Sequence, residues 1–297
     1  MRQFFFLSLL TLFVLSASTQ QYDKLIELKD HAVKLYYSEG REEKATAIAK
    51  RMDRAIPYYR QLLSFEPSVT LLVLSESDWS LFAKSAVYGM PHYNKQMTLI
   101  LAADDNPFWK SFLPPHDQLP PDLRTQIKTV YRRSDSSLSM ESFFDLLALH
   151  ELGHAFHSQA GLTMQRKWMG ELFANMLLHS YIAENEPQLL PALTLFPRVV
   201  ISGGIKGLTY TSLNDLELNY DEIAMKYPNN YGWYQCRLHS SAAIIYEQAG
   251  KSTGRKLWNA LKTEKQKLSD TQLLKFLKTA GTKPVADIIK NWDKETM

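Results

Sequence analysis

The chain is poor in cysteine: its 297 residues contain one, Cys236. A single thiol excludes an intramolecular disulfide, and no cysteine stands near the N-terminus to accept a lipid. We expect Cys236 to be a small buried hydrophobic residue. The alternative is a catalytic thiol, but its only support is that His239 is near in the sequence, which says little about a catalytic pair.

An excess of charge of one sign is missing as well. The chain has 34 Lys and Arg residues and 31 Asp and Glu residues, a formal net charge of +3 at pH 7. No Lys/Arg cluster is interleaved with aromatic residues, so we expect no nucleic-acid partner. The sequence has no internal repeats or low-complexity tracts, and its 45% hydrophobic content is enough for a large core.

Long apolar runs are confined to the first twenty residues. Arg2 and the chain terminus carry positive charge, an apolar run covers residues 4–15, and three small residues suited to cleavage follow. This pattern predicts a signal peptide over residues 1–18 and an exported protein, secreted or periplasmic, that begins near Thr19. The alternative is a membrane anchor, although the run is short for a spanning helix. No other segment could cross a bilayer, so we expect no membrane span after the signal is removed.

The most informative stretch of the sequence is Ser139–Gly161. Its apolar residues form a broad surface at helical spacing, and no Pro or β-branched residue interrupts residues 140–159. We therefore predict one helix, with Ser139 as its N-cap and Gly161 as its terminator.

This predicted helix contains the motif H-E-x-x-H. His150 and His154 would lie one turn apart on one face, so both imidazoles could bind a single Zn²⁺, with Glu151 beside them. Polar residues on so apolar a helix need partners if they are buried, and a metal would supply one. The motif is typical of zinc hydrolases.

The rest of the sequence predicts an α+β fold, with a small N-terminal sheet and helices followed by an all-helical C-terminal half. A polar lead-in or short helix comes first, and strands and helices then alternate, with residues 88–93 as a loop. The predicted strands are 31–37, 69–74 and 97–102, and the helices between them are 42–64, with a kink at Pro57, and 77–86. Residues 103–138 are expected to be loops around a short helix at 123–131. The later helices are predicted at 168–184, 188–201, 212–226, 231–249, 253–263, 270–279 and 284–294.

We divide the mature chain into an α/β subdomain, 19–138, and a helical subdomain with the active-site helix, 139–297, which form one catalytic unit.

A catalytic zinc usually has three protein ligands, so the chain must supply one more than the motif contains. The helix after the motif is apolar almost all round, and its polar residues Glu171 and Asn175 lie one turn apart. A buried carboxylate is costly unless it is paired or bound to metal. We predict Glu171 as the third ligand and Asn175 as the group that orients one imidazole through its other ring nitrogen. The alternative is a structural Glu171 paired with an arginine such as Arg166.

Together, the H-E-x-x-H motif, Glu171 and Asn175 resemble the gluzincin metallopeptidases, the thermolysin and aminopeptidase N group, and in architecture their compact peptidase MA-like members. Thermolysin-like enzymes have Asp at the position of Asn175, whose amide can accept from an imidazole but brings no charge. The metzincin continuation G-x-x-H is absent. We therefore expect His157 to be an ordinary helix residue and not a ligand.

The resemblance implies a zincin-like fold with one Zn²⁺ per chain. It also implies that Met97–Ala102 is the sheet edge that pairs with an extended peptide. A Tyr or His from the helical half would stabilise the oxyanion, and the candidates, in order, are Tyr234, Tyr231 and His239. The amine-binding motif of aminopeptidases, G-x-M-E-N, is absent, which favours an endopeptidase.

The function predicted from the sequence is hydrolysis of peptide bonds in a peptide or protein substrate. Zinc would acidify a water molecule, and Glu151 would take its proton and pass it to the leaving amine. Two alternatives stay open: a non-catalytic exported binding protein on a zincin fold, and a zinc hydrolase that acts on a non-peptide amide or ester.

Overall fold

The computed structural model describes residues 22–83 and 87–294. The predicted signal peptide, residues 1–18, lies outside the described residues. Among the helices of the described part, none is long and apolar enough to cross a membrane.

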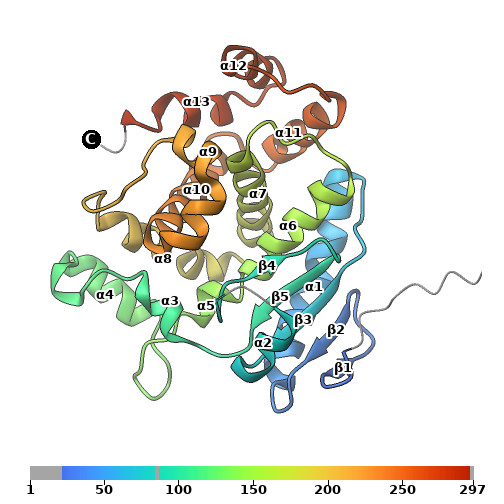
Figure 1. The fold of residues 1–297 in the computed structure, drawn as a ribbon, viewed down its shortest axis with the longest axis vertical. Coiled ribbons are helices and arrows are strands. Elements are labelled where there is room, and N and C mark those ends of the chain that lie inside the picture. The colour runs from blue at the N-terminus through green and yellow to red at the C-terminus, as the bar shows by residue number, and fades with distance from the viewer. Residues whose placement is uncertain (1–21, 84–86, 295–297) are drawn as a thin grey trace, which may run out of the picture.

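A five-stranded mixed sheet forms the N-terminal part of the fold (Figure 1). Its strand order is β1-β2-β3-β5-β4, with β2, β3 and β5 parallel and the short edge strands β1 and β4 antiparallel to their neighbours. The strands are β1 (Ile26–Leu28), β2 (Lys34–Tyr37), β3 (Thr70–Leu74), β4 (His92–Tyr93) and β5 (Thr98–Ala102). Apolar residues fill β3 and β5, the central parallel strands, and nearly all of them are buried on both faces of the sheet.

The structure corrects the predicted sheet at both edges. Residues 26–28 form strand β1 and not a polar helix, and His92–Tyr93 form strand β4 within the predicted loop. The expectation that Met97–Ala102 is the sheet edge is wrong, because β5 pairs with β3 on one side and with β4 on the other. Strand β4 takes the edge position instead.

Helices connect and cover the strands as expected. Helix α1 (Glu42–Leu63) continues through Pro57 as a single helix and packs beside the sheet, and α2 (Glu76–Phe82) follows β3. The irregular region 103–138 contains α3 (Pro107–Ser111), a 3₁₀ turn at residues 116–118 and α4 (Pro121–Val130).

The helix predicted across 140–159 is two helices, α5 (Glu141–Phe144) and α6 (Leu147–Gln159). At the break, the amide of Leu146 donates to the carbonyl of Phe143, and the amide of Leu149 donates to that of Leu146. These tight three-residue bonds replace the regular four-residue ladder. Ser139 is not the predicted N-cap: the N-cap of α5 is Met140 and that of α6 is Leu146, and the hydroxyl of Ser139 accepts from the amide of Glu141. Gly161 follows the end of α6 with φ +64°, the left-handed conformation of a helix terminator.

The remaining helices form the C-terminal part of the molecule, in agreement with the predicted helices (Figure 1). They are α7 (Lys167–Asn185), α8 (Leu190–Ser202), α9 (Leu213–Lys226), α10 (Pro228–Ala249), α11 (Ser252–Thr263), α12 (Asp270–Thr279) and α13 (Lys283–Asn291). Helix α7 is central: it contacts α6, α8, α9, α10 and α11, and its residues 168–182 are all buried.

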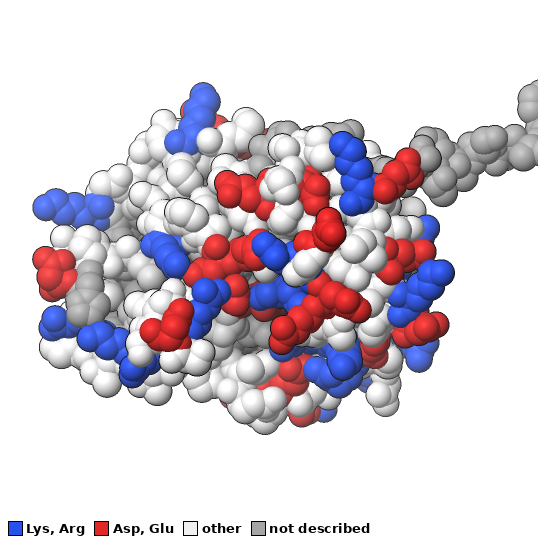
Figure 2. Space-filling model, turned by 90° about the horizontal axis from the view of Figure 1, so that it is seen from below, with Lys and Arg blue, Asp and Glu red and all other residues white. Residues whose placement is uncertain are grey.

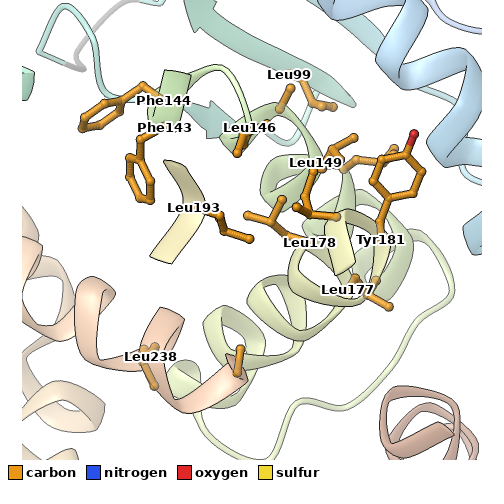
Figure 3. Packing of buried hydrophobic residues seen from close by; sticks show 14 of the residues in the cluster. Leu99, Phe143, Phe144, Leu146, Leu149, Leu177, Leu178, Tyr181, Leu193 and Leu238 are labelled. Atoms are coloured by element: carbon orange, nitrogen blue, oxygen red, sulfur yellow. The ribbon is translucent and has the colours of Figure 1, made fainter. Parts of the chain in front are cut away.

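One apolar core runs from the sheet into the helices (Figure 3). Leu99 of β5 lies near Leu149 of α6, which in turn lies near Leu178 and Tyr181 of α7. Each fully buried aliphatic side chain of this kind contributes about 1.5–3 kcal/mol relative to exposure. Residues on both sides of position 138 share this core, and it fixes the site helices against the sheet.

Charges of both signs are interspersed on the face seen in Figure 2. Ion pairs in the described part of the chain include Arg41 with Asp104 and Lys44 with Asp145. Such pairs balance the surface charge locally.

Candidate metal centre

The residues predicted to bind zinc converge where α6 packs against α7. His150 and His154 come from α6 and Glu171 from α7, all on the faces that meet. Their ligand atoms form the one three-residue group among the described His, Cys, Asp and Glu side chains that could hold a metal ion. The sequence prediction of this triad therefore agrees with the geometry.

The separations of the three ligand atoms suit a tetrahedral metal ion. His150 Nε2 lies 3.0 Å from His154 Nε2 and 3.2 Å from Glu171 Oε2, and His154 Nε2 lies 3.4 Å from the same oxygen. Ligands about 2.0–2.1 Å from a tetrahedral zinc stand about 3.3–3.4 Å from one another. These three atoms could therefore hold a zinc ion with little movement.

Hydrogen bonding also indicates that a cation belongs between these atoms. Asn175 Oδ1 lies 2.7 Å from His150 Nδ1 and can only accept, so this ring nitrogen carries the proton. In a neutral ring, His150 Nε2 then presents a lone pair to the carboxylate of Glu171 and to His154 Nε2. Lone pairs that face one another in a buried site repel unless a metal ion or a proton lies between them.

The charges around His154 also favour a positive charge at this position. Burial disfavours a charged His154, but the carboxylates of Glu171 and Glu151 outweigh this and raise its pKa to about 9. Burial would likewise raise the pKa of Glu171, yet His154 and His150 hold it well below its usual range. The pocket therefore favours one positive charge between its ligands.

Two donors that the sequence analysis missed hold the carboxylate of Glu171. The hydroxyl of Tyr220 on α9 donates to Oε1 at 2.6 Å, and Nε2 of Gln235 on α10 donates to Oε2 at 3.1 Å. Arg166 instead bonds Asp270, so the alternative partner for Glu171 is not used. Tyr220 gave no sequence signal, because it lies on another helix, 49 residues away in the sequence, of which only Leu216 and Ile223 are buried.

Gln235 could have been found from its spacing. Tyr231, Gln235 and His239 lie four residues apart on α10 and form one stripe, and all three line the cavity beside the triad. Tyr234 lies off this stripe. Its hydroxyl donates to the carbonyl of Ser212 at 2.8 Å, and the structure does not bring it to the metal triad.

The remaining oxyanion candidates lie at the cavity. The hydroxyl of Tyr231 is 3.1 Å from that of Tyr220, and burial together with Glu171 raises the pKa of Tyr231 above its ordinary value. It therefore keeps its proton at neutral pH. The ring of His239 stacks on that of His150 at 5.8 Å between centroids, and burial holds its pKa well below the usual value, so it is neutral.

Glu151 is buried in the cavity wall and makes no hydrogen bond or ion pair with any residue in the described ranges. The cavity has a volume of about 160 Å³. Its wall is mainly aromatic and apolar, with Phe108, Phe112, Phe143, Phe144, Leu147 and Phe196 among its residues. An unpaired carboxylate in such a wall is costly, and a water molecule at the metal would give it a partner.

The sequence analysis also made predictions for two side chains outside the triad, His157 and Cys236. His157, expected to be an ordinary helix residue, lies with its Nε2 3.0 Å from His154 Nδ1. Burial and the adjacent His154 lower the pKa of His157 to about 3, so it is neutral. Cys236 is buried, as expected, and burial raises the pKa of its thiol, which argues against a reactive thiolate.

Comparison of the chain with models of protein families, with curated proteins and with solved structures found no match. The case for a function therefore rests on the residues and their geometry.

Proposed function

We propose that this protein is a zinc-dependent hydrolase of peptide bonds. The observation that supports this best is the convergence of three ligand atoms, from His150, His154 and Glu171, at separations of 3.0–3.4 Å. The unpaired carboxylate of Glu151 lies in the wall of the adjoining cavity, where a general base is needed.

A zinc ion held by the triad would acidify a water molecule and polarise the substrate carbonyl. Glu151 would take a proton from the attacking water and deliver it to the leaving amine. The hydroxyl of Tyr231 donates a hydrogen bond to the oxyanion, since its raised pKa keeps it protonated. Tyr231 thus replaces Tyr234 as the preferred candidate.

The fold gives further support for a zincin-like peptidase. Strand β4 is the sheet edge beside α6, and His92 of this strand lines the cavity. An extended peptide could add to this edge through backbone hydrogen bonds while one side chain enters the cavity. A cavity of about 150 Å³ lined by apolar residues holds a benzene ring, so this pocket suits one apolar or aromatic side chain.

Export is part of the proposal and rests on the predicted signal peptide. A proteolysis product that begins near Thr19 would support it, and the mature protein is the form to assay. Cleavage within a chain, not at its end, is the proposed mode.

The test combines metal analysis with a substrate screen. Purified protein should contain about one zinc per chain, and Glu171→Ala should lose it. Glu184→Ala is the matched control on the same helix, because Glu184 pairs with Lys251 and Tyr246 far from the triad. A screen of peptides with both termini blocked, together with non-peptide amides and esters, then shows which bond the protein hydrolyses. No zinc after reconstitution would favour a binding protein, and turnover of esters alone would favour a non-peptide hydrolase.

A further inference from the structure

His157 occupies a position behind the proposed zinc ligand His154. It follows His154 by three residues on α6, so both rings lie on one face of the helix. Nε2 of His157 is 3.0 Å from Nδ1 of His154, and the two rings are nearly perpendicular, at 77°. The His157 ring also packs edge-on against Phe173 of α7, which fixes its orientation.

The hydrogen bonds that His154 can make leave one role for His157, that of an acceptor. Nε2 of His154 faces His150 and Glu171 and can bind a metal only with its lone pair free. A neutral His154 then carries its proton on Nδ1. The nitrogen that lies in range to accept a hydrogen bond from this N–H group is Nε2 of His157, which requires the His157 proton to be on Nδ1.

His157 is not itself placed to bind the metal. Its Nε2 faces the nitrogen of His154 that points away from the triad, and it is not a member of the described ligand group. Its contact with the site passes through His154.

We propose that His157 is a positioning residue that fixes the tautomer and the ring orientation of the zinc ligand His154. Asn175 does the same for His150, so each imidazole ligand has one uncharged partner on its outer nitrogen. This inference rests on the proposed zinc site and adds a residue outside the H-E-x-x-H motif to it.

Two variants separate the hydrogen bond from packing. His157→Phe keeps a ring against Phe173 but cannot accept a hydrogen bond from His154, whereas the side-chain oxygen of His157→Gln can accept one. Zinc affinity is measured by competition with a chelator, and Co²⁺ replaces zinc to report ligand geometry by its visible spectrum. We expect His157→Phe to bind zinc about 10–100-fold more weakly and to alter the Co²⁺ spectrum. His157→Gln should restore affinity to within a few-fold.

A measurement on the unaltered protein keeps the test independent of variant folding. Nitrogen-15 NMR of the zinc-loaded protein should show His154 and His157 both protonated on Nδ1. Protonation of His157 on Nε2, or wild-type zinc affinity in His157→Phe, would overturn the inference. Failure of the zinc site itself is distinguishable, because either the wild type would show no stoichiometric zinc or Glu171→Ala would bind zinc as the wild type does.

Discussion

Gly153 of α6 lies directly against Ala174 of α7: a methyl group added at position 153 would be 2.8 Å from the Ala174 Cα and 3.0 Å from its Cβ. The glycine therefore sets how closely the two helices cross. His150 and His154 flank it on α6, and Glu171 lies one turn before Ala174 on α7. Since the ligand atoms come from both helices, this crossing distance sets their separation.

We predict that Gly153→Ala weakens zinc binding at least tenfold. Alanine favours a helix by about 1 kcal/mol over glycine, but overpacking against a backbone typically costs about 1–3 kcal/mol and forces the helices apart. The measurements are chelator competition for zinc and thermal unfolding of the metal-free protein. Gly254→Ala is the control, because its added methyl would make one ordinary contact, 3.9 Å from Leu177. Unchanged zinc affinity in Gly153→Ala would show that the crossing tolerates a methyl group.

The second prediction concerns the general base. Glu151→Gln should bind one zinc per chain with near wild-type affinity, because Glu151 is not in the triad. Its turnover should fall by about 10²–10⁴-fold, since the amide cannot take a proton. Zinc analysis and single-turnover kinetics on a peptide found in the substrate screen check both halves. Turnover at the wild-type rate would exclude Glu151 as the base.

A matched pair of variants tests the oxyanion assignment. Tyr231→Phe removes the hydroxyl at the cavity, and we expect kcat/KM to fall by about 10²–10³-fold with zinc retained. Tyr234→Phe removes the hydroxyl that donates to Ser212. It should cost about 1 kcal/mol of folding stability and leave kcat/KM unchanged. Equal losses of activity in the two variants would contradict the placement of Tyr231 at the reaction centre.

The helices of this fold could be predicted from the sequence because their signals are local. Apolar spacing and capping residues specify α7 to α13 within a few residues. Strands β1 and β4 were missed because they have three and two residues, and only pairing with distant strands makes them strands. The family resemblance implied that Met97–Ala102 is the edge, but strand β4, which the sequence did not predict, takes that position.

The candidate metal ligands could be predicted because H-E-x-x-H is compact and Glu171 stands out on an apolar helix. The supporting contacts were not, since they depend on tertiary structure. Tyr220 reaches Glu171 from another helix, and Tyr231 and Tyr234 differ only in which side of α10 faces the cavity. The side that faces inward is fixed by the packing of α10 on α7 and α8.

The last prediction links zinc to protons. In the metal-free protein the pKa of His154 is raised to about 9, whereas Glu171 is already ionised. Zinc binds the neutral ring, so uptake at pH 7.5 should release about one proton from His154. The apparent affinity for zinc should rise about tenfold per pH unit below pH 9 and level off above it. Isothermal titration in buffers of different ionisation enthalpy gives the number of protons released.

The same linkage sets how the stability of the metal-free protein depends on pH. A raised histidine pKa stabilises the fold fully below its unfolded value of about 6.5, and this stabilisation is lost as pH rises through about 9. The Tm of metal-free protein should therefore fall over this window more than that of the zinc-loaded protein. His179→Gln is the control for the proton-release measurement. Burial lowers the pKa of His179 to about 4, so this histidine is neutral at pH 7.5, and its loss should leave the number of protons released on zinc binding unchanged. Zinc uptake without proton release at pH 7.5 would mean that His154 is neutral before the metal arrives, and that the carboxylates of Glu171 and Glu151 do not hold a proton in the zinc position.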